Sequence, residues 1–154
     1  MGLLIGPTPW WQANLVSVSP VGTTLPDGSR IICKAGGTAW IVAPNTTQVG
    51  QTWNGTATLL VGNKCCVCDW STLCSRLISR GFNPSDWFVP SPARLYNPGY
   101  VCRTQWDSFS ADRYWSSTEV NATNACLVCF SNGNALNPTK TSACCVRAFR
   151  CVTY

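Results

Sequence analysis

The sequence has 154 residues, of which only 11% are charged, and its formal net charge is +5 at pH 7. A chain of this length predicts one domain with a core of its own. The absence of histidine excludes Cys–His nucleophilic catalysis, and the six acidic residues are scattered. We therefore expect no enzyme and no catalytic residue. The arginines are scattered too, which argues against a nucleic-acid partner, and no apolar stretch is long enough to predict a membrane span.

The low charge is combined with eight tryptophans and eleven cysteines. Such a surface favours cover by neighbouring subunits, and the alternative is a monomer with a Ser/Thr/Asn/Gly surface. The apolar residues 3–5 and the pair Trp10–Trp11 add an N-terminal patch of a kind that soluble monomers avoid. The sequence therefore predicts a homo-oligomer, with a trimer favoured, or one of many copies on a particle.

The N-terminal segment, residues 1–29, is rich in Pro, Gly, Ser and Thr. It predicts an arm for attachment or oligomer contact, ahead of a domain over residues 30–154. Within the arm, Val16 and Val18 alternate with serines, which predicts one edge strand.

The start of the domain predicts a β-hairpin. Residues 30–34 and 38–43 are strand-like and are separated by Ala-Gly-Gly, which favours a tight turn. A polar loop over residues 45–55, carrying Trp53, follows the hairpin. Residues 57–61 then predict a third strand.

One helix is well defined by its periodicity, with Asp69 or Ser71 as the expected cap and Gly81 at the left-handed C-terminal position. Its apolar residues follow i, i+3, i+4, i+7, i+8 spacing and are Trp70, Leu73, Cys74, Leu77 and Ile78.

A second, shorter helical turn is expected from Ser91 and Pro92, and Pro98 ends it. Further strands are predicted over residues 126–130 and 145–152. One good helix, one short helix and several short strands together predict an α+β fold.

The eleven cysteines have spacings that fit zinc poorly, and histidine is absent. Cys126 and Cys129 have the spacing of a zinc knuckle, but Leu127 and Val128 favour a strand. A strand points its first and fourth residues to opposite faces, so one thiol would face the core and the other a second layer or a neighbour. Small apolar core residues are the expected role of most cysteines, with no metal site. A few of the cysteines are also expected to form disulfides after assembly.

Several blocks of the sequence resemble the Lcl C-terminal domain family. Residues 81–91 (GFNPSDWFVPS) resemble a Gly-…-Asp-Trp-…-Pro-Ser segment of that family. The blocks YWSSTE (residues 114–119), NACLVCFSNG (124–133) and VRAFR (146–150) resemble others. GTAWIVAP (37–44) is similar to an early strand of the family. The chain differs in having Cys126 where the family usually has Trp and Cys129 where it often has Asn. It also has PARLYNPG (92–99) where relatives have a longer acidic helix.

The resemblance implies a C-type-lectin-like fold, with short antiparallel strands, one clear helix and long loops. Family members occur in phage structural proteins and at the tips of bacterial adhesins, where trimers bind glycans. It therefore implies a phage virion surface structural protein, such as a head decoration, head fibre or tail-fibre domain. Its partners would be other virion proteins and, in some members, a host-surface glycan. The alternatives are a bacterial extracellular or cell-surface adhesin subunit that binds glycans, and a cysteine-based metal module or enzyme.

The buried structural anchors of such a domain are expected to be Trp87, Tyr114, Trp115, Phe130, Arg147 and Arg150. A ligand would be held by the loops at residues 106–113 and 119–124, which flank YWSST and would then lie on one edge. These loops offer ring faces for sugar stacking and oxygens that would bind sugar hydroxyls or, alternatively, calcium. Arg103 would add positive charge. The expected ligand-binding residues are Trp106, Asp107, Phe109, Asp112, Arg113, Glu119, Asn121 and Asn124. Packing of the same loops against a neighbouring subunit is the competing interpretation.

Overall fold

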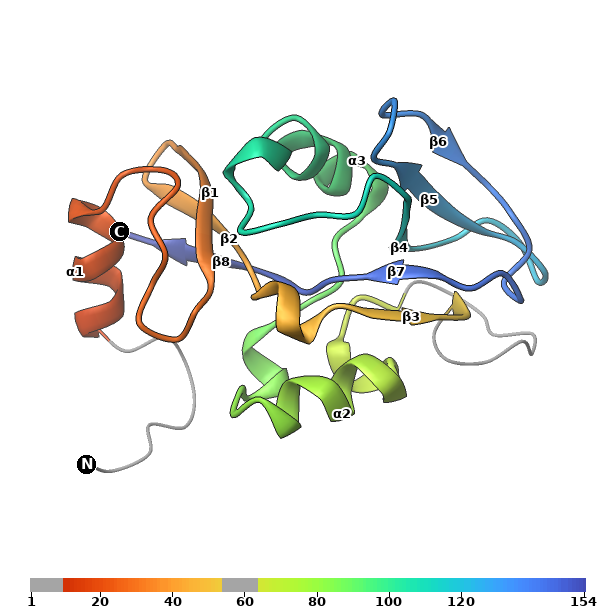
Figure 1. Cartoon of the computed structure of the whole chain (residues 1–154), viewed down its shortest axis with the longest axis horizontal. Coiled ribbons are helices and arrows are strands. Elements are labelled where there is room, and N and C mark those ends of the chain that lie inside the picture. The colour runs from red at the N-terminus through yellow and green to blue at the C-terminus, as the bar shows by residue number, and fades with distance from the viewer. Residues whose placement is uncertain (1–9, 54–63) are drawn as a thin grey trace.

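The computed structural model describes residues 10–53 and 64–154, with the backbone alone for residues 10–12. Short helices and two β-sheets make up this part of the chain, which confirms the α+β class (Figure 1). The strand predicted at residues 57–61 and the apolar residues 3–5 lie outside the described residues, as do the side chains of Trp10 and Trp11. None of the helices in the described part has the length and apolar character that a membrane crossing requires.

Helix α1, Trp10–Val18, occupies the place where an edge strand was predicted, so that prediction was wrong. Val16 is fully buried in the core, whereas Val18 is 80% exposed. The end of the helix is stabilised by Lys34, whose Nζ donates to the carbonyls of Val16, Ser17 and Ser19 at 2.9–3.0 Å. These are carbonyls that a helix C-terminus leaves without partners, and a positive charge there is also favourable. This part of the expected arm thus packs on the domain.

The first sheet contains the predicted hairpin, β1 (Arg30–Ala35) and β2 (Thr38–Val42), and the strand β8 (Phe149–Thr153). Gly36 and Gly37 both have positive φ, 58° and 78°, as the tight turn requires. Strand β2 lies in the centre, because it pairs with β1 on one side and antiparallel with β8 on the other. Thr38 faces Thr153 in this pairing, so the sheet joins distant parts of the chain.

The second sheet has five strands in the order β3-β7-β4-β5-β6. Their bounds are β3 (Val49–Gln51), β4 (Arg113–Glu119), β5 (Ala125–Cys129), β6 (Ala135–Leu136) and β7 (Cys144–Val146). Three predictions are corrected here. The loop at residues 45–55 contains β3, and the strand at 145–152 is split into β7 and β8 in different sheets. YWSSTE, for which no strand was predicted, lies in strand β4, whose pairing with β5 changes register between Trp115 and Glu119.

Helix α2, Ser71–Ser79, confirms the periodic helix, with Leu73 and Leu77 fully buried. Ile78, by contrast, is 59% exposed. The predicted cap was wrong, because Trp70 occupies the capping position without a side-chain bond. Gln51 of β3 takes over part of this role, since its Oε1 accepts from the backbone N–H of Leu73 at 3.2 Å. Gly81, with φ of 85°, has the predicted left-handed conformation.

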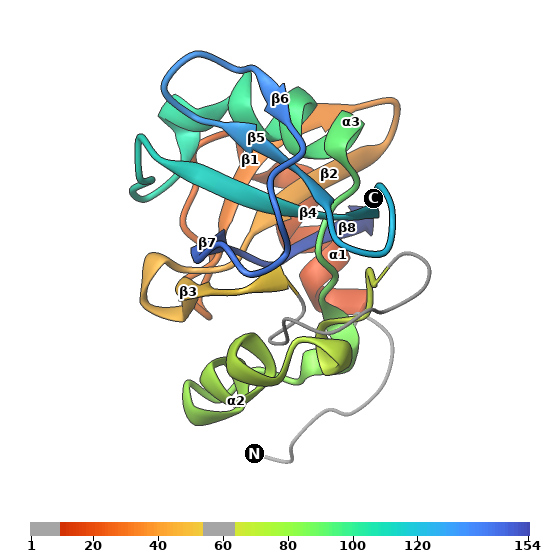
Figure 2. The same ribbon diagram turned by 90° about the vertical axis from the view of Figure 1, so that its right-hand side faces the viewer.

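Helix α3, Pro92–Arg94, is the predicted short helix, and Ser91 Oγ accepts from the N–H of Arg94. It leads into a wide helical turn, Leu95–Tyr100, which is interrupted at Asn97 before Pro98. The remaining short helical segments are 3-10 turns at Asn45–Thr47, Val67–Asp69, Pro84–Asp86 and Arg103–Gln105. Helices α2 and α3 lie on opposite sides of the molecule (Figures 1 and 2).

Strand β4 lies between two clusters of core residues. Trp115 points into one cluster, which includes Trp53, Trp70 and Leu127. Its neighbour Tyr114 points into the other, which includes Trp106 and Phe130 among its large rings. Successive side chains of a strand alternate between faces, so one strand supplies both clusters. Burial on both faces explains why this strand is the centre of the packing.

Candidate functional site

The two loops expected to carry a ligand lie at opposite ends of β4. Because a strand of seven residues spans about 20 Å, the loop at residues 106–113 and the loop at 119–124 are well separated. Figure 2 shows β4 running across the view between them. The expectation that both lie on one edge was therefore wrong, because it assumed a compact YWSST segment instead of an extended one.

The aromatic residues of the first loop face the core. Trp106 is 4% exposed, and its ring makes edge contacts with Tyr114, Phe130 and Phe149 at centroid distances of 5.2–5.6 Å. Phe109 is half-buried and packs against Phe130 at 6.1 Å. Trp106 thus presents no ring face to a sugar, which corrects its expected role, and Phe109 is largely used in packing.

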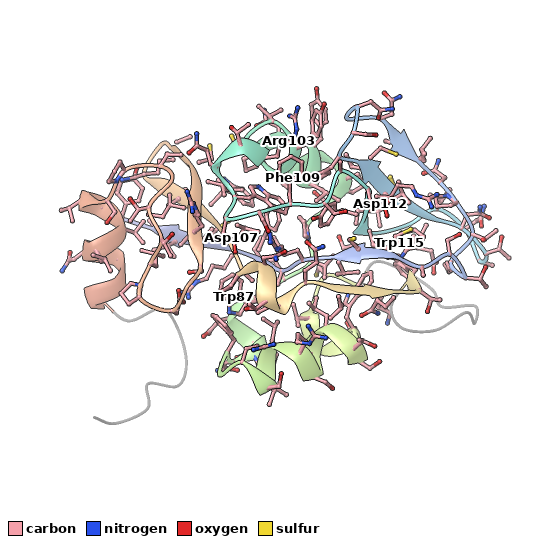
Figure 3. The ribbon with its side chains drawn as sticks, viewed as in Figure 1. Trp87, Arg103, Asp107, Phe109, Asp112 and Trp115 are labelled. Carbon is pink, nitrogen blue, oxygen red and sulfur yellow. The ribbon has the colours of Figure 1, made fainter. Side chains whose placement is uncertain are left out.

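Asp107, labelled in Figure 3, lies in the same loop and is paired with the buried side chain of Arg147. The guanidinium donates to Asp107 Oδ1 at 3.2 and 3.4 Å, to the carbonyl of Ser108 at 2.6 and 2.7 Å, and to Asn45 Oδ1 at 3.2 Å. It also lies 4.9 Å from the centre of the Trp106 ring. Burial lowers the pKa of Arg147, and the carboxylate of Asp107 opposes that effect. We call Arg147, Asp107, Asn45 and Trp106 the arginine cluster.

The second loop is held by another buried cation. Lys140 is 1% exposed, and its Nζ donates to Glu119 Oε2 at 2.6 Å and to the carbonyl of Ala122 at 3.0 Å. The ammonium lies 5.0 Å from the centre of the Trp53 ring. We call Lys140, Glu119 and Trp53 the lysine cluster. One of the oxygens proposed for calcium or for sugar hydroxyls, Glu119 Oε2, thus already accepts from an ammonium group.

The two asparagines of this loop stabilise its own backbone. Asn121 Oδ1 accepts from the N–H groups of Thr123 and Asn124 at 2.9 and 2.8 Å. Asn124 Nδ2 donates to the carbonyl of Asn137 at 2.8 Å. Asn121 thus stabilises the turn between β4 and β5, whereas Asn124 connects this turn to the segment after β6.

Asp112 and Arg113 remain at the surface. Their side chains are 62% and 45% exposed and form an ion pair at 3.6 Å. Both residues are thus open to solvent, and they lie at the start of β4.

The six expected anchors all occupy buried positions, with exposures between 1% and 5%. Trp115 Nε1 donates to the carbonyl of Gln51, and the hydroxyl of Tyr114 donates to Gln48 Oε1 at 2.6 Å. Burial raises the pKa of Tyr114 to about 12. Arg150 lies 5.5 Å from the centre of the Trp87 ring. These side chains connect β4 and β8 to neighbouring segments.

The cysteine side chains are free thiols. Cys126 and Cys129 are each 8% exposed, so both are buried within the domain, which agrees with a second layer and not with a neighbouring subunit as the partner of the outer thiol. Burial raises the pKa of Cys126, and it raises that of Cys144 to about 11, which keeps these thiols protonated near neutral pH. Within the described part of the chain, no group of three or more His, Cys, Asp or Glu is arranged to hold a metal ion.

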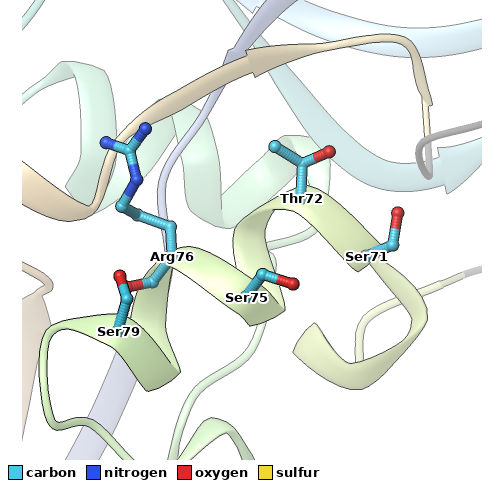
Figure 4. A pocket seen from close by; sticks show the side chains of 5 residues that line it. All are labelled: Ser71, Thr72, Ser75, Arg76 and Ser79. Carbon is cyan, nitrogen blue, oxygen red and sulfur yellow. The ribbon is translucent and has the colours of Figure 1, made fainter.

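Two surface features were not found from the sequence. One is a shallow hollow of about 520 Å³ on the outer face of α2, lined by Ser71, Thr72, Ser75, Arg76 and Ser79 (Figure 4). The other is a row formed by Tyr96, Tyr100 and Arg103 beside α3. The two tyrosines lie in an irregular turn, so their spacing gives no periodic signal in the sequence. The row is recognised only from the stacking of their rings.

A scan against models of known protein families finds no match to this chain, and a search of curated proteins finds none either.

Proposed function

We propose that this chain is a structural protein of a phage virion surface, built on a C-type-lectin-like domain and without catalytic activity of its own. The observation that carries the proposal is the assembly of the blocks named in the sequence resemblance. YWSSTE forms β4, its partner β5 comes from the next block, and VRAFR leads from β7 into β8. Three separate parts of the resemblance thus meet around one core.

The path of the chain supports the same proposal. Strand β8 returns to pair with β2 of the N-terminal hairpin. The second sheet and the helices α2 and α3 lie in the segment between these two strands (Figure 1). Irregular segments project from this closed loop, in agreement with the long loops expected of a lectin-like fold. The buried cations at both ends of β4 would keep those segments fixed without disulfides.

Mass spectrometry of purified phage particles tests the proposed location. The expected result is this chain at many copies in each particle, retained after washing at high salt. Its absence from particles, with the protein found only in the infected-cell lysate, would reject the virion role.

The proposed trimer is tested by light scattering on the full chain and on a variant that lacks residues 1–9. These nine residues precede α1 in the sequence and lie outside the described residues. We expect a trimer for the full chain and a folded monomer for the variant. Equal masses would mean that the segment is not the assembly element.

One observation favours the second candidate, an extracellular bacterial adhesin subunit. Cys33 and Cys102 pack against the same core cluster, and burial together with the neighbouring Cys33 thiol raises the pKa of Cys102. Neighbouring thiols of this kind form disulfides in secreted proteins. Thiol alkylation followed by peptide mass spectrometry decides between the two. A Cys33–Cys102 disulfide in protein from its native location would favour the adhesin, and alkylated thiols would favour the virion protein.

A further inference from the structure

Beside α3, two tyrosines and an arginine form a continuous row, in which Tyr96 is exposed and Tyr100 and Arg103 are half-buried. The rings of Tyr96 and Tyr100 are stacked, with centroids 5.7 Å apart and planes 23° from parallel. The guanidinium carbon of Arg103 lies 4.0 Å from the centre of the Tyr100 ring. Figure 3 shows Arg103 toward the upper edge of the molecule, away from the core residue Trp115. We call these three residues the tyrosine–arginine surface.

The inner side of this surface is fixed by packing. Tyr100 contacts the buried ring of Phe130, with centroids 5.7 Å apart. Gly133, in the turn between β5 and β6, lies so close that a Cβ atom there would be 2.6 Å from the Tyr100 ring. Arg103 is held by a hydrogen bond of 2.9 Å from its Nη1 to the carbonyl of Tyr100. Such support sets the direction of the rings before any ligand arrives, which lowers the entropic cost of binding.

The outer side remains open. Tyr96 is 46% exposed, although the other large rings of the molecule are mostly buried. Among the ion pairs of the described residues, none includes Arg103, in contrast to Arg147 and Lys140. The turn that packs on Tyr100 carries the exposed amides of Asn132 and Asn134. The surface therefore combines a flat aromatic face, a cation without an acidic partner and neighbouring amide groups.

These three features match one ligand class. A sugar ring stacks its C–H face on an aromatic ring, and amides bind its hydroxyl groups. A guanidinium pairs with a carboxylate through two parallel hydrogen bonds. We propose that the tyrosine–arginine surface binds a carboxylated sugar, with the ring on Tyr96 and the carboxylate on Arg103. This inference rests on the proposed role at a surface that meets glycans, and it moves the ligand away from both loops flanking β4.

The test uses the full-length protein and four immobilised polymers in a binding assay: polygalacturonate, neutral dextran, dextran sulfate and poly-L-glutamate. The expected order places polygalacturonate first. Tyr96→Ala and Arg103→Gln should each weaken its binding by about tenfold or more, the factor that an interaction of about 1.4 kcal/mol represents. Arg103→Lys should give an intermediate loss, because the ammonium keeps the charge but not the planar pair of donors.

Matched controls come from the same chain. Tyr154 is 39% exposed with Lys34 over its ring at 4.4 Å, so Tyr154→Ala removes a similar tyrosine–cation contact elsewhere. Arg80→Gln removes an exposed arginine at the end of α2. Both controls should keep binding within about twofold of the wild type, since neither residue belongs to the tyrosine–arginine surface. Thermal unfolding of every variant checks that the fold is retained.

Three results would overturn the inference. Wild-type protein that binds none of the polymers would leave no glycan site here, whereas the virion location would still stand on the particle analysis. Equal binding of dextran and polygalacturonate would remove the role of the carboxylate. Binding of poly-L-glutamate that depends on Arg103 but not on Tyr96 would indicate an acidic protein partner instead of a sugar.

Discussion

The loops at the two ends of β4 are each held by a buried cation that lies over an aromatic ring and beside a carboxylate. At one end, the arginine cluster places a buried guanidinium over Trp106 with a carboxylate beside it. At the other end, the lysine cluster places a buried ammonium over Trp53 with a second carboxylate. The two clusters differ in how many segments of the chain the cation connects. Arg147 connects the segments around Asn45 and Ser108 to the β7–β8 connection, whereas the ammonium of Lys140 binds the turn after β4.

The comparison indicates that geometry, and not charge alone, decides how many segments one cation can hold. A guanidinium has a rigid fork of five N–H donors, and an ammonium has three donors on a compact centre. Asp107 is 28% exposed, while Glu119 is 11% exposed, so the lysine cluster is the drier of the two. Substitutions in the two clusters can show whether the number of connected segments or the burial of the cluster decides its contribution to stability.

The largest effect is expected from removing the strand side chain that lies between the two clusters. Trp115 is 1% exposed, and Trp115→Ala should lower the free energy of unfolding by roughly 3–5 kcal/mol, as a large cavity in a core does. Urea titration followed by circular dichroism measures this. An unchanged midpoint would mean that Trp115 is not a core residue and instead contacts a ligand.

Removal of the guanidinium should rank second. Arg147→Met should cost about 3 kcal/mol, because a buried pair is broken and the Ser108 carbonyl loses its donors. Arg147→Lys should recover only part of this cost, since the fork is lost. Full recovery by lysine in the same titration would show that charge alone is required.

Removal of the ammonium should cost less. Lys140→Met should lower the free energy of unfolding by about 2 kcal/mol, the range of a hydrogen bond to a charged group, because fewer segments are released. The Arg147→Met/Lys140→Met double variant serves as the control. Because the clusters are well separated, the two costs should add within about 0.5 kcal/mol. A larger cost for Lys140 than for Arg147 would make burial, and not the number of connected segments, the deciding factor.

Alkaline pH should weaken the arginine end through Tyr114. The pKa of Tyr114 is raised to about 12 from 10.0, so the unfolded chain loses this proton first. The contribution of Tyr114 to stability is therefore complete below about pH 10 and is lost as the pH rises toward 12, by about 1.4 kcal/mol at about pH 11. Urea titrations of the wild type and Tyr114→Phe across this range isolate the effect. Parallel losses in both proteins would assign the alkaline sensitivity to other groups, such as Cys144.

The smallest effect is expected at the exposed pair of Asp112 and Arg113. Arg113→Ala should change the free energy of unfolding by less than about 0.5 kcal/mol, because both side chains are open to solvent. Thermal unfolding at low and high salt measures this. A loss comparable to that of Lys140→Met would show that the arginine cluster extends to the surface.

The elements with local signals could be predicted from the sequence. The hairpin of β1 and β2 has a glycine turn, and α2 has apolar spacing and Gly81 at its end. Strand β4 could not be recognised in the same way. Tyr114 and Trp115 are both buried, so the alternation of polar and apolar residues that normally indicates a strand is missing.

The candidate site was less predictable, since the partners of its residues are distant in the sequence. The ring of Trp106 is covered by Tyr114, Phe130 and Phe149. Glu119 is neutralised by Lys140, which lies after β6. A loop residue with such partners has the same composition as a ligand-binding residue, so the pattern alone cannot distinguish them. Arg103, by contrast, was expected to contribute charge, and it lies half-buried over the ring of Tyr100.

The central position of β2 in the first sheet also has a consequence for synthesis of the protein. One edge of β2 pairs with β1 at once, but the other edge pairs with β8, near the end of this sequence. A nascent chain would therefore expose the backbone groups of β2 until residues 149–153 leave the ribosome. An uncovered edge of this kind can pair with another chain. A ribosome stall or a premature stop before β8 should accordingly produce insoluble protein rather than a soluble, shortened domain.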